Sequence, residues 1–365
     1  MLRILMCLIV GLSCVSFLSC GSARASSSAN AGYSTINASD YPSLQAAIDA
    51  IPSTGGTLVI NGQFEATAEP CKDNDLPGPC IFHRSNIRIL GDGVTSKIYT
   101  TKPGTIALQI MGSDLVTVQG VEFSGPWQKG AGGDNGVAVR IDQYYIWPST
   151  RITVQDCRVH NFPFDGLWAR NGTSQISFTH NESYDNQGNG IEIEAQDSSV
   201  VDNNVHDNEH QGIEIYTAAQ NLRVANNRFD RNLVGIKLIN DPSYGLLSNI
   251  SIVGNSASNN VATGILYQAI SPGEQPAGLI AITGNTVTGN GDGITLSYAG
   301  MGFALTGNLV SSNTYANINI TQISDIVISN NVLTALPGAP HATQGINVSN
   351  DSNRVSLSNN AVDGY

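Results

Sequence analysis

A short phrase, glycine followed by alternating apolar and outward-pointing residues, recurs through the middle of the chain at a nearly constant spacing. It stands as Gly166-Leu-Trp-Ala-Arg170, Gly190-Ile-Glu-Ile-Glu194, Gly212-Ile-Glu-Ile-Tyr216 and Gly235-Ile-Lys-Leu-Ile239, with spacings of 24, 22 and 23 residues. An alternation of period two indicates a strand with one buried face, and a recurrence near 23 residues indicates one such strand per coil of a solenoid. Equivalent positions of successive coils must therefore stack.

The phrase continues in both directions, from Gly136-Val-Ala-Val-Arg140 to Gly345-Ile-Asn-Val, with longer spacings where a turn gains a loop. A second signal runs eight or nine residues ahead of it, at Cys157, Asn181, Asn204, Asn227, Asn255, Asn285, Asn308, Asn331 and Asn360. One Asn per coil lets the amides stack and hydrogen-bond along the axis, as in-register side chains do in ladder structures. Together the patterns predict an all-β fold, a right-handed parallel β-helix.

The coil pattern, as in Val200-Val-Asp-Asn-Asn-Val-His-Asp-Asn-Glu-His-Gln-Gly-Ile-Glu-Ile215, resembles the broad pectin-lyase-like β-helix superfamily. The resemblance extends from about Ile36 to the end of the chain. It implies the β-helix fold and an activity on polysaccharides, whereas the chemistry has to come from the site itself.

The chain opens with an apolar run from Ile4 to Ser19 behind Met1-Leu-Arg, which is typical of a secretory leader. Ala23-Arg24-Ala25 offers a cleavage site, so that residues 1–25 would be a signal peptide. Leu18-Ser19-Cys20-Gly21 offers the alternative of a lipoprotein signal that leaves Cys20 as a lipid anchor. Both alternatives place the protein outside the cytoplasm, either secreted or anchored to a membrane.

Residues 26–35 form a short linker, and residues 36–365 carry one repeat pattern, which predicts a single β-helix domain. Residues 40–51 predict a helix with Asp40 or Ser43 at its N-cap. This helix would cover the first coil, because an open solenoid end is an exposed sheet edge. After the last coil the chain stops at Val362-Asp-Gly-Tyr365, so the final coil is bare, truncated or covered by a partner subunit.

Cysteine usage and net charge narrow the environment and the partners. Cys71 and Cys80 flank a loop that contains proline and glycine, so an oxidising compartment favours a disulfide between them. Cys157 occupies a position in the Asn series and is predicted to be buried. A formal charge of −12 argues against nucleic acid as a partner, although a bound divalent cation could reverse the charge locally.

The second and fourth residues after each glycine point out of the solenoid and form two columns. The first column contains Ala138, Trp168, Glu192, Glu214, Lys237, Leu266 and Thr295. The second column contains Arg140, Arg170, Glu194, Tyr216, Ile239, Gln268 and Ser297. Ionisable and aromatic residues cluster in four consecutive coils, with Arg140 one coil earlier. This clustering predicts a site centred on Glu192, Glu194, Glu214 and Lys237.

A surface ladder of ion pairs, worth ~0–1 kcal/mol per pair, is the alternative explanation for these columns. Against it, Glu192 would stack on Glu214 at roughly 4.8 Å, which is unfavourable without a cation, a shared proton or a nearby base. Glu192 and Glu214 would lie about 5 Å apart, as in a retaining glycosidase. Glu194 and Glu214 would lie about 8 Å apart, as in an inverting one, and backbone spacing does not choose between them.

Two enzyme groups of the superfamily share part of this pattern. Pro163-Phe-Asp165-Gly, Gly188-Asn189-Gly, His210-Gln211-Gly and Gly235-Ile-Lys237-Leu-Ile239 are similar to the phrases of polygalacturonase-type glycoside hydrolases. The resemblance implies that Asp165 is an acid and that Lys237 stands in place of an arginine. Gly188-Asn189 replaces the Asp-Asp pair of that family, which leaves the glutamate columns to supply acid and base.

The second group contains alginate lyases and chondroitinase B-type lyases, to which Glu192-Ile-Glu194 is similar. That resemblance implies that Glu192 and Glu194 hold calcium, that Lys237 abstracts a proton next to a uronate, and that Arg170 pairs with the uronate carboxylate. A hydrolase would need no cofactor.

Aromatic residues and long turns predict the walls of the groove. Trp168 and Tyr216 point outward beside the glutamates and are expected to contact sugar, as are Tyr145 and Trp147 in the loop that also holds Tyr144. Further walls are expected from residues 124–135 with Trp127, from residues 241–248 and from residues 270–278. His160, His180 and His206 are expected in turns away from the columns, in structural or solvated roles.

The sequence thus predicts an exported β-helix that acts on a polysaccharide, with glycoside hydrolysis by paired carboxylates as the first hypothesis. Glu214 and either Glu192 or Glu194 are its acid, base or nucleophile candidates, and Asp165 is an auxiliary acid. The alternatives are a calcium-assisted lyase or uronate epimerase and a non-catalytic glycan-binding or surface protein.

Overall fold

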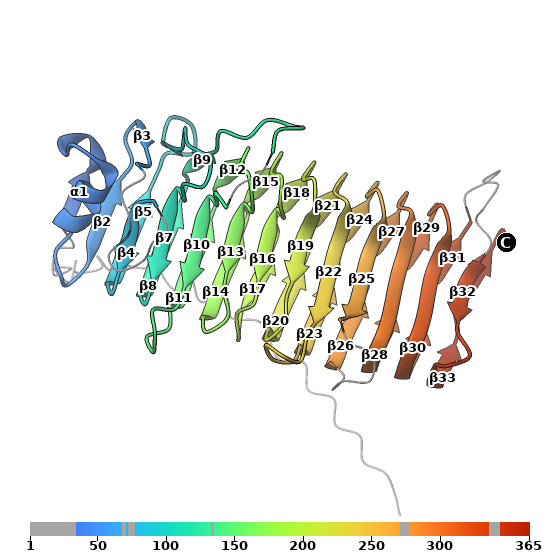
Figure 1. Cartoon of the computed structure of the whole chain (residues 1–365). Coiled ribbons are helices and arrows are strands. Elements are labelled where there is room, and N and C mark those ends of the chain that lie inside the picture. The colour runs from blue at the N-terminus through green and yellow to red at the C-terminus, as the bar shows by residue number, and fades with distance from the viewer. Residues whose placement is uncertain (1–33, 68–70, 72–76, 133–134, 271–276, 336–343) are drawn as a thin grey trace, which may run out of the picture. The chain divides into compact units, whose positions relative to one another are not determined.

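The computed structural model describes residues 34–67, 71, 77–132, 135–270, 277–335 and 344–365. Within them the chain winds through successive coils, and every paired ladder between its strands is parallel (Figure 1). A coil such as residues 174–193 contains three strands separated by two tight turns. The predicted all-β parallel solenoid is confirmed.

The strands form three stacks, each one strand per coil. The first stack contains β1 (Ser34–Asn37), β2 (Gly56–Val59), β5 (Ser85–Leu90), β8 (Asp114–Gln119), β11 (Thr150–Gln155), β14 (Ser174–Thr179), β17 (Ser199–Val201), β20 (Gln220–Ala225), β23 (Ser248–Val253), β26 (Gly278–Thr283) and β33 (Asn353–Ser358). The second contains β3 (Gln63–Glu65), β6 (Lys97–Tyr99), β9 (Glu122–Ser124), β12 (Arg158–His160), β15 (Glu182–Tyr184), β18 (Asn204–His206), β21 (Arg228–Asp230), β24 (Ser256–Ser258), β27 (Thr286–Thr288), β29 (Leu309–Ser311), β31 (Val332–Thr334) and β34 (Ala361–Asp363).

The third stack, called the groove face below, carries the Gly-Ile-x-Ile phrases. It contains β4 (Cys80–Phe82), β7 (Leu108–Met111), β10 (Val139–Asp142), β13 (Leu167–Ala169), β16 (Ile191–Ile193), β19 (Gln211–Ile215), β22 (Val234–Asn240), β25 (Thr263–Ala269) and β32 (Gln344–Val348). Two long strands, β28 (Asp292–Thr306) and β30 (Ala316–Ser329), pair with both the groove face and the first stack. They join the two stacks into a single 22-stranded sheet.

The repeated glycine opens each groove strand because no side chain fits there. A Cβ atom on Gly190 would lie 2.2 Å from Val205 Cγ1, and one on Gly235 would lie 2.6 Å from the Gly264 carbonyl oxygen. The isoleucines that follow, such as Ile191 and Ile213, are fully buried and stack in register inside the solenoid. The glycine and the alternation therefore have one cause, which is the close packing of the coil interior.

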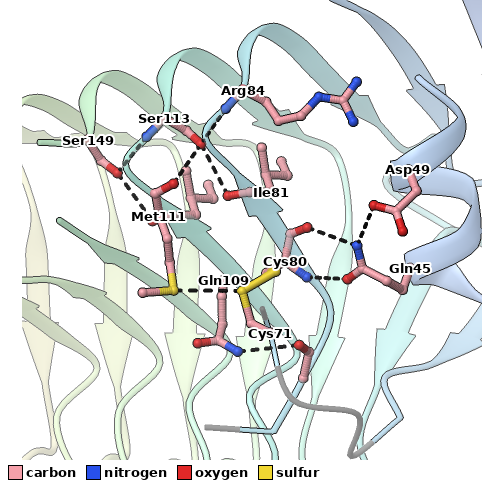
Figure 2. Close-up of a disulfide and its surroundings, with 12 residues drawn as sticks. Gln45, Asp49, Cys71, Cys80, Ile81, Arg84, Gln109, Met111, Ser113 and Ser149 are labelled. Atoms are coloured by element: carbon pink, nitrogen blue, oxygen red, sulfur yellow. Dashed lines mark hydrogen bonds between the residues drawn. A yellow bond between two sulfur atoms is a disulfide. The ribbon is translucent and has the colours of Figure 1, made fainter. Parts of the chain in front are cut away.

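The N-terminal end is covered by a short 3₁₀ turn, η1 (Ala38–Asp40), and by α1 (Leu44–Ala50). Ser43 is the N-cap, and its hydroxyl accepts a hydrogen bond from Ala46 N at 3.1 Å, as one of the two predicted caps. Gln45 pins the helix to β4, because its amide donates to Cys80 O and accepts from Cys80 N at 2.7 Å (Figure 2). The predicted disulfide between Cys71 and Cys80 is present beside it.

The asparagine ladder is present, with one correction. Asn181 Nδ2 donates to Asn203 Oδ1 at 3.0 Å, and Asn203 Nδ2 donates to Asn227 Oδ1 at 2.9 Å, so Asn203 and not Asn204 is the member of that coil. Asn204 already belongs to β18, where the alternation must bury Val205. The ladder continues through Asn255, Asn285, Asn308 and Asn331 to Asn360. Cys157 begins it as a buried free thiol whose backbone N–H donates to Asn181 Oδ1.

A second ladder, which the sequence patterns did not predict, runs along the next turn and leads into the groove face. Its members are Asn186, Asn208, Asn232, Asn260, Asn290 and Asn313. Each is nearly fully buried. Two amide ladders thus fix the two turns on either side of the second stack, and the second ladder sets where each groove strand begins.

None of the described helices is long and apolar enough to cross a membrane. The predicted signal segments, including Cys20, lie outside the described residues. In the last described coil Leu357 and Val362 are exposed. An oligomer through that coil stays a prediction.

Candidate active site

The central outward column forms as expected. Trp168 of β13 pairs with Glu192 of β16, Glu192 with Glu214 of β19, and Glu214 with Lys237 of β22. The structure therefore brings these four predicted residues together on neighbouring strands of the groove face.

One coil earlier the predicted columns are shifted by two residues. Arg140, not Ala138, pairs with Trp168, and Asp142 follows Arg140 in the second column. Ala138 is buried and stands where the glycines of later coils stand, since Val139 pairs with Leu167. The prediction took Gly136 as the residue that opens this strand, whereas Ala138 holds that position, two residues later.

Asp165 lies fully buried behind the column, against Glu192. Asn189 N donates to Asp165 Oδ1 at 2.6 Å. Among the described residues Asp165 Oδ2 has no hydrogen-bond partner. A proton held between the neighbouring Asp165 and Glu192 carboxyls would satisfy this oxygen.

Burial raises the pKa of Glu192, and the neighbouring Asp165 carboxylate raises it further. Burial also raises the pKa of Asp165. Glu192 is 9% exposed, so one side of the pair still reaches the surface. The arrangement can hold a proton at neutral pH and deliver it to the groove.

Asn189 connects the carboxylates. Its Nδ2 donates to Glu192 Oε2 at 3.1 Å and to Glu214 Oε2 at 3.2 Å, and its Oδ1 accepts from Gln211 N at 3.2 Å. The predicted stacking of Glu192 on Glu214 is thus relieved by a shared amide donor.

Glu214 carries a compensating cation on its other side. Lys237 Nζ lies 3.0 Å from Glu214 Oε1, and Gln211 Nε2 donates to the same oxygen at 3.4 Å. Glu214 is thus held in place by an amide donor on one side and by an ion pair on the other.

The second column joins an aromatic ring to two arginines. Trp168 Nε1 donates to Glu194 Oε1 at 3.2 Å, and the guanidinium carbons of Arg140 and Arg170 each lie 5.0 Å from the centre of the Trp168 ring. Both arginines bind Asp142 Oδ2, at 2.7 Å and 3.0 Å. Burial raises the pKa of Glu194. Burial also lowers the pKa of Arg140, against the opposing effect of Asp142.

A cleft of about 420 Å³ opens over these residues. It is lined by Asp142, Gln143, Trp168, Arg170, Asn171, Glu192, Glu194, Tyr216 and Tyr244. Tyr244 comes from the predicted wall at residues 241–248. Glu214 pairs with Glu192, and Lys237 pairs with Glu214 one strand further on, but neither is among the residues that line the cleft. Burial raises the pKa of Tyr216.

The other predicted walls have different positions. Tyr145 and Trp147 are exposed but lie beyond the cleft, next to Tyr144 and His83. Trp127 is buried, and its Nε1 donates to Ala131 O at 3.1 Å, so it packs within its own loop. Most of the predicted wall at residues 270–278 lies outside the described residues.

The three histidines predicted to lie away from the columns, His160, His180 and His206, do so, although His160 and His206 are on strands and not in turns. His160 of β12 and His206 of β18 belong to the second stack and stack on either side of Tyr184. Their Nε2 atoms lie 3.4 Å from Glu122 and Glu182, respectively. His180 is mainly exposed.

Calcium would need several oxygens turned toward one point. Glu192 is turned to Asp165 and Asn189, whereas Glu194 is turned to Trp168. Over the described parts of the chain, no group of three or more His, Cys, Asp or Glu residues is arranged to hold a metal ion. The observed donors therefore do not fit calcium, and we assign it no step; a calcium-dependent activity stays a prediction.

The sequence patterns did not predict Asn189 as a link, Arg140 as a neighbour of Trp168, or the cleft residues Asp142, Gln143 and Asn171. The sequence did contain a signal for Asn189, because it stands next to the glycine that opens the Glu192 strand. Asp142 and Arg140 could be found only by aligning the strand on Val139.

The chain is similar to known β-helix proteins. A family model for a right handed beta helix region matches residues 80–257 and 145–310. The A-module of a mannuronan C-5 epimerase from Azotobacter vinelandii is 15% identical, with a TM-score of 0.69 over 90% of this chain and 100% of the other. No curated protein matches the sequence significantly.

Two hydrolase structures are also similar. The catalytic unit of an alpha-1,3-glucanase from Streptomyces thermodiastaticus is 13% identical, with a TM-score of 0.62 over 91% of this chain and 69% of the other. An endo-xylogalacturonan hydrolase from Aspergillus tubingensis is 12% identical, with a TM-score of 0.58 over 90% and 93%. At these identities the likeness shows the fold alone.

Proposed function

We propose that this chain, which belongs to the pectin-lyase-like superfamily of right-handed β-helix proteins, is an exported enzyme that hydrolyses glycosidic bonds of a polysaccharide. The observation that carries the proposal is the pair formed by Glu192, which lines the cleft beside the buried Asp165, and Glu214, whose Oε1 lies 3.0 Å from Lys237 Nζ. Glycoside hydrolysis needs one carboxylic acid and one carboxylate on neighbouring positions.

Glu192 is the general acid of this scheme. It lines the cleft, and its raised pKa keeps it protonated where an ordinary glutamate has lost its proton. Glu192 protonates the glycosidic oxygen as the bond to the leaving sugar breaks. Asp165, buried behind it, is the auxiliary acid that holds the shared proton.

Glu214 is the nucleophile. Glu192 Oε2 and Glu214 Oε2 both accept from Asn189 Nδ2, at 3.1 and 3.2 Å, so these oxygens are at most about 6.3 Å apart. Retaining enzymes place their carboxyls ~5–5.5 Å apart and inverting enzymes ~6.5–9.5 Å apart. The bound lies below the inverting range, so in this proposal Glu214 attacks the anomeric carbon, and water, deprotonated by Glu192, then releases the sugar with retained configuration.

Trp168, Arg170 and Tyr216 line the same cleft and are the proposed sugar contacts. Among the solved structures of similar fold are polysaccharide hydrolases, which supports a polysaccharide substrate.

A lyase or epimerase is the second candidate. It is favoured by Arg170 at the cleft, which could pair with a uronate carboxylate, and by the similar fold of the mannuronan C-5 epimerase module. Its base would be Lys237, but Lys237 Nζ lies 3.0 Å from Glu214 Oε1 and does not line the cleft, whereas Glu192 does. This placement makes hydrolysis the better-supported reaction.

Product analysis separates the candidates. The protein would be incubated with alginate, polygalacturonate, xylan and α-1,3-glucan, and new reducing ends, unsaturated uronate and epimerised residues would be measured. Hydrolysis predicts reducing ends without unsaturation. Unsaturated ends would establish elimination, epimerised residues would establish epimerisation, and binding without any product would leave a glycan-binding protein.

A further inference from the structure

A tight hairpin at residues 144–147, called the aromatic hairpin here, follows groove strand β10. Tyr144 N donates to Trp147 O at 2.9 Å, and Trp147 N donates to Tyr144 O at 3.0 Å. Tyr145 is 75% exposed, Ile146 83% and Trp147 47%. Tyr145 also has a φ of 52°, a conformation that a bulky residue seldom adopts. Large apolar side chains held at the surface in this way mark an interaction site.

The hairpin is held from below by other rings. The ring of Tyr144 lies 4.6 Å from that of Phe82 and nearly parallel to that of Trp147, at 6.1 Å. The ring of His83 lies 4.5 Å from that of Trp147. The exposed side chains are therefore positioned by packing as well as by the backbone.

The rings rest in turn on a small apolar cluster outside the solenoid. Cys71, Cys80 and Met111 form it, and Phe82 and Tyr144 pack against it. Figure 2 shows the disulfide with Met111 directly beside it. The disulfide and Met111 thus support the hairpin from below.

The hairpin and the cleft lie on the same face of the molecule. Phe82, Met111 and Asp142 are consecutive members of the second outward column, and Asp142 and Gln143 line the cleft. Glu192 lies two strands beyond β10 and four strands beyond β4. At ~4.8 Å per strand the hairpin lies about 10–19 Å from the acid, a distance of several sugar units.

We infer that the aromatic hairpin is a distal subsite for the glycan chain whose scissile bond lies at Glu192, and that the protein acts on internal bonds of long chains. This inference rests on the proposed function. Tyr145 and Trp147 offer exposed rings to the apolar faces of pyranose units. In the cleft itself the ring of Trp168 is contacted by two arginines, so the hairpin adds accessible aromatic surface to that of Tyr244, which is 65% exposed.

Affinity electrophoresis tests the inference, with alginate, polygalacturonate or xylan in the gel and Glu192→Gln as the parent protein to prevent cleavage. Replacing both Tyr145 and Trp147 by Ala should raise the Kd for the retained polymer at least tenfold. Tyr315→Ala is the matched control, because Tyr315 is 59% exposed but lies before β30, away from the hairpin. It should leave retention unchanged.

In the active protein the double substitution should raise KM for the polymer at least tenfold more than KM for a trisaccharide of the same sugar. Equal effects on both substrates, or unchanged polymer retention, would overturn the distal subsite. Retention that depends on the hairpin in a protein that forms no product would support the subsite and refute the hydrolase. Absence of retention on all three polymers would refute both.

Discussion

Asp165 and Glu192 are neighbouring buried carboxyls in successive coils of the groove face, and burial raises the pKa of both. Asp165 is fully buried, whereas Glu192 lines the cleft. A proton held by the pair can therefore reach a bound substrate only through Glu192. The pair gives a chain with a formal charge of −12 a proton donor at neutral pH.

Glu192→Gln should reduce turnover ~10²–10⁴-fold, because a positioned general acid typically contributes that much. The fold should persist, since the introduced amide can donate to Asp165 Oδ2. Initial rates and the circular dichroism spectrum of the variant check this prediction. A variant with more than half of the original rate would exclude Glu192 as the acid.

The pair should also make stability depend on pH. The pKa of Glu192 is raised in the folded protein, so the folded state binds more protons than the unfolded state above the ordinary glutamate value of 4.5. The contribution to stability is complete below that value and is lost as pH rises through the folded pKa. The melting temperature should therefore fall between mildly acidic and alkaline pH, and Glu192→Gln should flatten the fall. An equal pH slope in both proteins would contradict the shared proton.

Asn189→Asp should abolish most activity, because it puts a third carboxylate about 3 Å from Glu192 and Glu214. Any remaining activity should have its optimum at lower pH, where the added group is neutral. Asn204→Asp is the matched control: it makes the same change 3.4 Å from Glu182, on the second stack. If both variants lose activity equally, the effect is one of folding and Asn189 does not link the carboxylates.

Glu214→Gln and Lys237→Ala distinguish the two reactions. For hydrolysis, the loss of the nucleophile should remove nearly all turnover, while the loss of Lys237 should be milder because Asn189 and Gln211 still donate to Glu214. A calcium chelator should have no effect. For elimination or epimerisation the order should reverse, and a requirement for calcium would restore the Glu192 and Glu194 calcium hypothesis.

The fold was predictable because its cause is repeated in every coil. A buried isoleucine and an excluded Cβ recur at each glycine, so the period is visible without knowledge of any contact. Asn203 was not predicted as the ladder residue because two adjacent asparagines satisfy the same spacing. Only the burial of Val205 decides between them. The register of β10 was predicted wrongly because Ala138 replaces the usual glycine.

The site was predictable in part for the same reason. Glu192, Glu214 and Lys237 stack because they occupy equivalent positions of the repeat. Asp165 was assigned from resemblance, and its contact with Glu192 depends on side-chain direction, which a period does not give. Tyr244 enters the cleft from a loop, where no repeat constrains the chain.

The anomeric configuration of the first-formed product tests the central claim most directly. Proton NMR spectra recorded during cleavage of a susceptible polysaccharide show the new reducing end before it mutarotates. A glutamate pair with carboxylate oxygens at most about 6.3 Å apart predicts retained configuration. Inverted configuration would instead assign catalysis to the wider spacing of Glu194 and Glu214, and an unsaturated product would contradict hydrolysis altogether.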